Sequence, residues 1–328
     1  IIGSGPSGFY AADALLKCDL NVHLAMFEKL PVPYGLVRFG VAPDHGKIRN
    51  VIKIYEKVAA ENRFTYWGNV TIGTDVTVEE LQNHFDALIF AFGAATDRRL
   101  GIHGEDLPRS YTATSFCAWY NGHPDFQDEH FDLSHDTAVV IGQGNVAMDV
   151  ARILALPADE LAKTDMASNA VEDLAKSKVK DVYVIGRRGA VQAKFTPKEI
   201  GELGEIPGCD LIIDPADLDL SEEDQAELEL PESKQHQRNY ELMKEMAGRT
   251  PTPGNRRIFL KFYLSPMEIL GTNGVEGVVL QKNRMKGEPG QQWSEGTGET
   301  FEMSCGVFFR SVGYRGVALE GVPFDQKK

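Results

Sequence analysis

The chain opens with Ile1-Ile2-Gly3-Ser4-Gly5-Pro6-Ser7-Gly8, and this stretch decides the predicted fold. Two apolar residues end a strand, three glycines follow at the spacing Gly-x-Gly-x-x-Gly, and a helix is predicted from Phe9 to Lys17. In dinucleotide-binding folds the first glycine allows a tight turn, the second lets a pyrophosphate approach the backbone, and the third lets the helix pack close to the strand. The N–H groups at the start of such a helix attract phosphate. Glycine triplets also occur in ordinary turns, so the pattern needs support from the residues that follow.

A carboxylate supplies this support. The next predicted strand runs from Asn21 to Phe27 and ends in Glu28, 20 residues after Gly8. At this place in the fold an acid accepts hydrogen bonds from the ribose hydroxyls of adenosine. The first nucleotide site therefore suits an adenine ribose with free hydroxyls, as in FAD.

A second unit of the same kind begins at the predicted strand from Thr137 to Ile141. It continues as Gly142-Gln143-Gly144-Asn145-Val146-Ala147, in which alanine takes the packing position of the third glycine, and a helix is predicted from Met148 to Leu156. The paired strand, Asp181 to Ile185, ends in Gly186-Arg187-Arg188-Gly189. Two guanidinium groups can hold a 2′-phosphate that an acid would repel, so the second site suits NADPH over NADH. The alternative for the two arginines is a solvated strand end.

Length and composition bound the class of protein. A chain of 328 residues suggests about two domains. A net charge of −14 argues against general nucleic-acid binding, and no apolar run approaches the length of a membrane span. The four cysteines are far apart and form no Cys-x-x-Cys, so neither a redox pair nor a metal site is expected. Buried thiols in a reducing compartment are the preferred interpretation.

The other segments carry weaker signals. Lys29 to His45, rich in proline and apolar residues, is predicted to be an irregular loop that covers a ligand or plugs the sheet edge. Lys47 to Glu61 has the apolar spacing of one amphipathic helix, and Asp86 to Phe92 reads as a buried parallel strand. Asp210 to Leu230 is predicted to be an exposed acidic loop and helix, and Lys282 to Thr300 a hairpin loop.

Longer runs point to a family. The most specific are Gly35 to His45, Gly142 to Arg152, Val184 to Gly189 and Arg310 to Tyr314. With these runs the chain resembles the adrenodoxin-reductase-like ferredoxin–NADP⁺ reductases, a branch of the two-dinucleotide-binding flavoprotein superfamily. The resemblance covers nearly all of the chain.

This resemblance implies an α/β fold with two Rossmann-like domains, the NADP domain inserted into the FAD domain. We expect residues 1–96 and 316–328 to form the FAD-binding domain and residues 97–315 the NADP-binding domain, with a linker from Arg98 to Glu105. Family members re-enter the FAD domain with a segment that carries a tryptophan near the flavin. The given sequence stops at Lys328 before such a segment, so both termini are expected to be trimmed and part of the flavin pocket to be missing.

The implied reaction passes a hydride from NADPH to FAD and then single electrons to ferredoxin or a similar acidic iron–sulfur protein. One alternative is an electron-input flavoprotein subunit of the glutamate-synthase type. Another is a truncated nucleotide-binding module without activity. A disulfide reductase is disfavoured because the cysteine pair is absent. The bacterial cytoplasm is favoured over the mitochondrial matrix.

The site residues follow from the motifs and the resemblance together. The residues expected at FAD are Gly3, Gly5, Ser7, Gly8, Glu28, Leu36 and Val70. Those expected at NADP are Arg98, Gln143, Gly144, Asn145, Val146, Arg187, Arg188 and Glu199.

Two further residues match polar positions near the flavin of the family. His45 could donate a proton or could only shape its loop. Asp149 could face the flavin or could be an ordinary helix-face carboxylate. For docking of the acidic partner, Arg257 and Lys261 share one face of a predicted strand around Phe259, although a solvated charged face would look the same.

Overall fold

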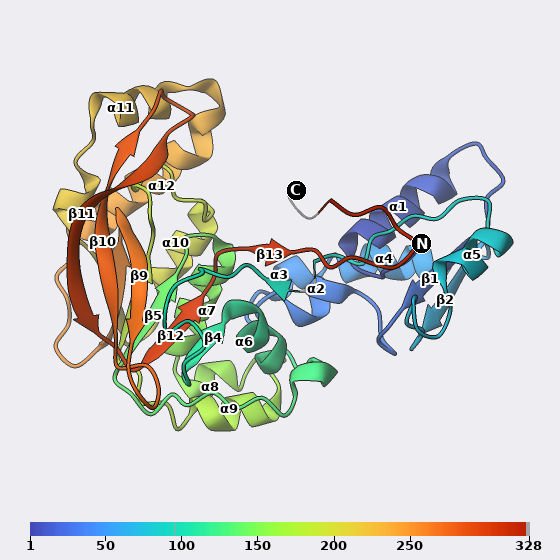
Figure 1. Cartoon of the computed structure of the whole chain (residues 1–328), viewed down its shortest axis with the longest axis horizontal. Helices are drawn as coiled ribbons and strands as arrows, with labels where there is room; N and C mark the ends of the chain where they lie inside the picture. Colours follow the sequence, from blue (N-terminus) through green and yellow to red (C-terminus); the bar gives the residue numbers. More distant parts are fainter. Residues whose placement is uncertain (95, 326–328) are drawn as a thin grey trace. The chain divides into compact units, whose positions relative to one another are not determined.

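The computed structural model describes residues 1–94 and 96–325 and divides the chain into two compact units (Figure 1). The first unit comprises Ile1–Arg98 and Tyr314–Lys328, and the second comprises Arg99–Gly313. The second unit is therefore an insertion in the chain of the first. Across the described ranges, we find no helix with the length and apolar character that a membrane crossing requires.

The first unit is built on parallel strand pairing. Its elements are α1 (Pro6–Lys17), β1 (Leu24–Glu28), α2 (Gly35–Phe39), α3 (Gly46–Arg49), α4 (Ile52–Ala59), β2 (Phe64–Gly68), α5 (Val78–His84), β3 (Thr96–Asp97) and β13 (Tyr314–Arg315). β1 pairs in parallel with β2, and Ile2 forms parallel bridges to both Phe27 and Phe90. The opening residues thus lie between β1 and the segment around Phe90. The predicted strand from Asp86 to Phe92 is reduced to this one bridge, and its side chains are exposed or half-buried.

The predicted helix after the first glycine loop is confirmed, whereas the strand predicted before it is reduced to isolated bridges at Ile2. α1 begins at Pro6, which suits a first helical position because that N–H has no helical partner. Its buried face carries Phe9, which stacks on Tyr55 of α4 with ring centroids 4.8 Å apart. Met26 of β1 is fully buried in the same cluster.

Two predictions between β1 and β2 need correction. The segment from Lys29 to His45 is not wholly irregular, because it contains the short helix α2. The single helix expected from Lys47 to Glu61 is divided into α3 and α4 at Asn50 and Val51. The apolar spacing is still correct where α4 packs, since Tyr55 and Val58 are buried.

The second unit contains a six-stranded parallel sheet and a three-stranded antiparallel sheet. The parallel strands are β4 (Ser110–Thr112), β5 (Thr137–Ile141), β6 (Asp181–Ile185), β7 (Cys209–Ile213), β8 (Arg256–Lys261) and β12 (Val307–Arg310), in the order β4-β12-β5-β6-β8-β7. The helices are α6 (Ala113–Tyr120), α7 (Asn145–Ala155), α8 (Ala158–Leu161), α9 (Ser168–Leu174), α10 (Pro197–Leu203), α11 (Glu222–Glu229) and α12 (Lys234–Ala247), with 3₁₀ turns at Pro124–Phe126, Pro215–Leu218 and Pro231–Ser233.

The central strand β5 of the parallel sheet consists mainly of apolar residues, as a strand buried on both faces requires. Ala138, Val139 and Val140 of β5 are fully buried because both faces of the parallel sheet are covered. Ala138 and Val140 pack with helix residues such as Met148, whereas Val139 packs with residues of the antiparallel sheet such as Val278. The predicted strands β5, β6 and β8 and the helix after β5 are confirmed, so the α/β fold is as expected. The strand β7 was missed, because its alternating residues lie in a segment read as an acidic loop.

The antiparallel sheet has the order β11-β10-β9 and consists of β9 (Leu264–Leu270), β10 (Gly277–Lys286) and β11 (Trp293–Ser304). The hairpin loop expected from Lys282 to Thr300 is therefore mostly strand. The strand β11 was not recognised because it is almost wholly exposed, is rich in polar residues and glycine, and has no apolar face. The ladder between β10 and β11 shifts register between Gln281 and Asn283.

The chain passes between the two units at residues 98–99 and 313–314, and each unit holds its own end of these connections by hydrogen bonds or ion pairs. In the first unit, β3 pairs antiparallel with β13, and Arg98 Nε donates to the carbonyl of Tyr314 at 3.2 Å. In the second unit, the buried Glu105 accepts from the backbone N–H groups of Leu100 and Gly101 and pairs with Arg310 Nη1 at 2.9 Å. The predicted linker from Arg98 to Glu105 thus ends in a buried ion pair.

Candidate nucleotide-binding sites

The first glycine loop is closely packed except at Gly5. A Cβ atom on Gly3 would lie 2.5 Å from the carbonyl oxygen of Ala91, and Gly3 has φ +101°, which favours glycine. A Cβ atom on Gly8 would lie 2.2 Å from the carbonyl oxygen of Gly3. A Cβ atom on Gly5 would meet nothing within 4 Å. Only this glycine therefore has open space above the start of α1, where a pyrophosphate would approach.

Glu28, the residue predicted to bind the ribose, also holds the backbone of this loop. Its Oε2 accepts from Ser4 N at 3.0 Å and from Ser4 Oγ at 2.6 Å, and its Oε1 accepts from Leu30 N at 3.1 Å. An ionised carboxylate has about four acceptor positions, so further hydrogen bonds remain possible. Ser4 was missed from the sequence because it occupies a variable position of the glycine motif.

The covering segment approaches the same loop. Tyr34 N donates to the carbonyl of Ser4 at 3.0 Å, and Tyr34 has the left-handed φ of +92°. A Cβ atom on Gly35 would lie 2.9 Å from Gly5 Cα. Of the other predicted FAD residues, Leu36 is exposed in α2, Ser7 is exposed in the first turn of α1, and Val70 N donates to the carbonyl of Glu28 at 2.9 Å. Their contacts with FAD remain predictions.

The second glycine loop joins three strand ends. Gly142 follows β5, and its N–H donates to the carbonyl of Ile185 at the end of β6. Gln143 Nε2 donates to the carbonyl of Lys261 at the end of β8, at 3.0 Å. Gly144 precedes α7 directly, and a Cβ atom there would meet nothing within 4 Å. Asn145 Oδ1 accepts from Thr196 N at 3.0 Å, while Val146 is half-buried.

Arg187 and Arg188 follow β6 beside this loop. In the part of the chain that the structure describes, neither guanidinium group has a carboxylate within salt-bridge distance. Burial, and next the neighbouring Arg187, lower the pKa of Arg188, whereas Glu227 raises it. The two adjacent cations thus lie beside the glycine loop without a salt-bridged carboxylate among the described residues. This arrangement can accept a doubly charged phosphate.

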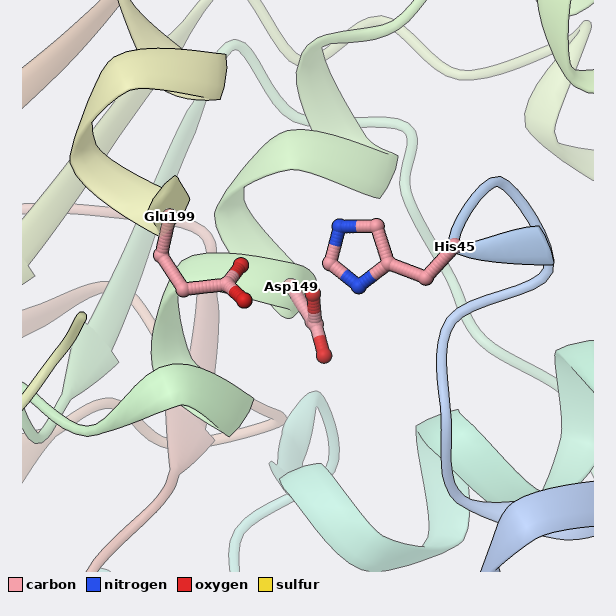
Figure 2. Close-up of side chains that lie close together, drawn as sticks. All are labelled: His45, Asp149 and Glu199. Atoms are coloured by element: carbon pink, nitrogen blue, oxygen red, sulfur yellow. The ribbon is translucent and has the colours of Figure 1, made fainter. Parts of the chain in front are cut away.

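The side chains of Asp149 and Glu199 lie close together (Figure 2), and each forms an ion pair with Arg152. Arg152 of α7 is buried, and its Nη2 lies 2.6 Å from Asp149 Oδ1. Its Nη1 lies 3.2 Å from Glu199 Oε2 and 3.7 Å from Glu202 Oε2, both on α10. Arg152 was not singled out from the sequence, because only its spacing to Asp149 is local. A buried charge cluster of this kind can bind and orient a polar ligand.

Two other predicted residues belong to the first unit. His45, labelled in Figure 2, immediately precedes α3. Arg98, expected at NADP, is exposed and donates to Tyr314. Their roles near the cofactors remain predictions.

The docking residues lie at opposite ends of β8. Arg257, at the amino end, makes a two-pronged ion pair with Asp181 at 2.8 and 2.6 Å and borders a groove of about 880 Å³. Lys261, at the carboxyl end, has Asp214 4.0 Å away. Phe259 lies between them on the same strand face, as the strand pattern predicted, and it stacks on Tyr183. Each cation thus has a nearby carboxylate, which reduces the positive potential that docking would use.

The two glycines of the second loop differ in the space around them, and this difference gives a pair of predictions. Gly142→Ala should lower the free energy of unfolding by at least about 2 kcal/mol, because its Cβ would lie 2.1 Å from the carbonyl oxygen of Ser311 and its φ is +132°. Gly144→Ala should leave stability within about 1 kcal/mol but raise the KM for NADPH at least about tenfold. Urea unfolding and steady-state kinetics measure both. An unchanged KM in Gly144→Ala would contradict a pyrophosphate at this position.

Comparison with known proteins shows the family of the chain. The family model described as pyridine nucleotide-disulphide oxidoreductase matches residues 1–205. NADPH-ferredoxin reductase FprA of Mycobacterium tuberculosis is 46% identical over 334 residues, which cover 100% of this chain and 72% of that protein. Human mitochondrial NADPH:adrenodoxin oxidoreductase is 41% identical over 339 residues, covering 100% of this chain and 68% of that protein.

Solved structures give the same result. The structure of Mycobacterium tuberculosis FprA in complex with NADPH has a TM-score of 0.95 and covers 99% of this chain and 72% of that chain. The glycine loops, Glu28 and the arginine pair therefore stand in a chain whose similarity to reductases of this kind extends over its whole length. The chain belongs to the adrenodoxin-reductase-like family of NADPH–ferredoxin reductases.

Proposed function

We propose that the chain transfers electrons from NADPH through FAD to a ferredoxin-type iron–sulfur protein. The observation that carries the proposal is the contrast between the two ribose positions. Glu28 is the last residue of β1 in the first unit, whereas Arg187 and Arg188 follow β6 in the second. An acid suits the free ribose hydroxyls of FAD, and two guanidinium groups suit the 2′-phosphate of NADPH. The similar FprA was solved with NADPH.

The residues present fit both nucleotides. Gly5 and Gly144 each leave space where a side chain would begin, at the start of α1 and α7 respectively. Glu28 would hold one ribose, and the N–H groups at the start of α1 would hold the FAD pyrophosphate. The start of α7 would hold the NADPH pyrophosphate, and Arg187 and Arg188 would hold its 2′-phosphate. When bound, the flavin supplies the conversion of a two-electron hydride donor into single electrons.

The buried cluster around Arg152 supports an orienting role. Its guanidinium group fixes the carboxylates of Asp149 and Glu199, so their positions are set before any ligand binds. We propose that Glu199 and Asp149 orient the nicotinamide end of NADPH and that His45 serves as a polar group near the flavin. No protein nucleophile is required, because the cofactors carry the redox chemistry.

The full-length protein provides the test. It should absorb near about 450 nm as a flavoprotein, lose that absorbance when NADPH is added without oxygen, and then reduce a [2Fe–2S] ferredoxin. Absence of flavin would overturn the proposal in favour of a nucleotide-binding module. Flavin reduction with electron delivery only to a partner subunit would indicate the glutamate-synthase type instead.

Docking of the acidic partner at Arg257 and Lys261 remains a separate prediction. Arg257→Glu/Lys261→Glu should slow ferredoxin reduction at low ionic strength, and the effect should fade as salt screens the charges. The ion pairs with Asp181 and Asp214 imply a modest slowing, of about threefold. Stopped-flow reduction of ferredoxin and of a small neutral quinone across a salt series separates docking from damage. Equal loss with both acceptors would indicate damage to the fold.

We place the reaction in a bacterial cytoplasm, since the more similar of the two relatives compared is bacterial and the other is mitochondrial. Fractionation of the source cells, followed by detection of the protein, would check this location.

A further inference from the structure

The backbone of the two arginines is held by the antiparallel sheet and by the turn that leads into it. The carbonyl of Arg187 accepts from Asn283 Nδ2 of β10 at 2.9 Å. The carbonyl of Arg188 accepts from the backbone N–H of Tyr263, between β8 and β9, at 3.1 Å. Both hydrogen bonds come from residues more than 70 positions later in the chain. The arginine loop is therefore fixed by a sheet that contributes no strand to the nucleotide-binding core.

Asn283 occupies an irregular place in its strand. The ladder between β10 and β11 shifts register between Gln281 and Asn283, as in a β-bulge. Lys282 and Arg284 on either side are exposed, while Asn283 is buried. Residues 297–299 of β11 lie opposite Lys282 alone, so the extra residues belong to β11. Asn283 is the first paired residue of β10 after this irregularity, and it is the residue that reaches Arg187.

The environment of Asn283 makes its side-chain position definite. Its backbone N–H donates to the carbonyl of Tyr263 at 2.6 Å, and its Nδ2 also contacts Ser265 Oγ at 2.8 Å. Tyr263 therefore makes two backbone hydrogen bonds. Its carbonyl accepts from Asn283 N, and its N–H donates to the carbonyl of Arg188. Asn283 and Tyr263 thus form one clamp on both arginine carbonyls.

This clamp holds the backbone of the arginine loop before a phosphate binds. Arg187 and Arg188 are adjacent like charges, and neither guanidinium group has a paired carboxylate in the described part of the chain. Their mutual repulsion favours a loop that spreads the two side chains apart until an anion arrives. Holding the backbone in advance lowers the ordering cost of binding a phosphate between them.

We propose that Asn283 is a positioning residue for recognition of the 2′-phosphate, acting through the Arg187 carbonyl. The inference rests on the proposed function, because it assigns the 2′-phosphate of NADPH to this arginine pair. Asn283 sets selectivity between NADPH and NADH without contacting either nucleotide. A ligand that carries a phosphate on the 2′ position of adenosine depends on Asn283, and one that lacks it does not.

The test uses Asn283→Ala and Asn283→Asp in the full-length holoenzyme. Asn283→Ala should lower the NADPH-to-NADH ratio of kcat/KM about tenfold, through KM for NADPH, while kcat at saturating NADPH stays near the parent value. Asn283→Asp keeps the size but loses the donor, so it should lose at least as much selectivity. A second measurement is binding of adenosine 2′-monophosphate, which should weaken by the same factor, while adenosine 5′-monophosphate binding stays unchanged.

Two controls make the result decisive. Thr297→Ala removes the hydrogen bond from Thr297 Oγ1 to the Lys282 carbonyl at the same bulge, so it loosens the strand without touching the arginine loop, and it should leave selectivity unchanged. In an Arg187→Ala background, Asn283→Ala should have little further effect on adenosine 2′-monophosphate, because it acts through that arginine.

The outcomes separate the two claims. If Arg187→Ala/Arg188→Ala changes the NADPH-to-NADH ratio but folded Asn283→Asp does not, the positioning role of Asn283 is overturned. If Asn283→Ala and Thr297→Ala lose selectivity equally, the sheet and not the side chain is responsible, and the proposal is again overturned. If the arginine variant leaves the ratio unchanged, the assignment of the 2′-phosphate itself fails.

Discussion

Replacing Arg187 and Arg188 by alanine is expected to lower the NADPH-to-NADH ratio of kcat/KM by at least about a hundredfold. Each charge-assisted hydrogen bond to a phosphate contributes about 1.5–3 kcal/mol, or roughly one to two decades of affinity. Both guanidinium groups lack a paired carboxylate in the described residues, so binding the phosphate breaks no existing ion pair of theirs. The loss should appear with NADPH, whose 2′-phosphate we propose that they hold, and hardly at all with NADH.

Steady-state kinetics with both nucleotides measure this ratio in the full-length protein. Arg284→Ala is the matched control, since Arg284 lies on β10 but pairs with Glu295 on the exposed hairpin. It removes one positive charge and should change the ratio less than about twofold. A parent-like ratio in the double alanine variant would show that the two arginines are only a solvated strand end.

Replacing the buried Arg152 by leucine is expected to lower the free energy of unfolding by about 3–5 kcal/mol. Arg152 is 3% exposed and contacts Asp149, Glu199 and Glu202. Leucine fills much of the volume but leaves the buried carboxylates without this cation. Removing one partner of a buried ion pair costs more than the pair itself is worth, because the remaining charge is stranded away from water.

Urea unfolding measures the loss, and pH distinguishes its cause. The deficit of Arg152→Leu relative to the parent should shrink as the pH falls, because protonation removes the stranded negative charge. Arg238→Ala is the control, since Arg238 and Glu241 form an exposed pair on α12 worth less than about 1 kcal/mol. A deficit that does not change with pH would point to lost packing and not to stranded charge.

Local patterns allowed much of the fold to be predicted. Gly3 to Gly8 and Gly142 to Ala147 are short runs in which each glycine or alanine meets a requirement of its own backbone position. The structure has the expected helix after both runs and the expected strand before the second, while Ile2 before the first forms isolated bridges. Glu28 and the arginine pair could be singled out because they lie at the end of the strand that comes after each glycine loop and its helix. The strand of Arg257 and Lys261 was also correct.

Errors arose where local pattern and tertiary environment disagree. The apolar spacing from Lys47 to Glu61 continues through the break at Asn50 and Val51, so the sequence suggests one helix where there are two. The strand β11 is mostly exposed, so its sequence does not show the alternation of apolar and polar residues by which a half-buried strand is recognised. The predicted strand from Asp86 to Phe92 pairs only at Phe90.

The sequence by itself determined the two glycine loops with their helices and the residue types at the ends of the strands that follow, because these are read along short stretches of chain. The tertiary structure alone decided which distant side chains lie beside the charged residues. It places Glu199 beside Arg152, Asp181 beside Arg257, and Asn283 beside Arg187. These partners are separated by 47, 76 and 96 residues. A charge shows its sign in the sequence, but its energy depends on the distance and burial of its partner, which only folding brings together.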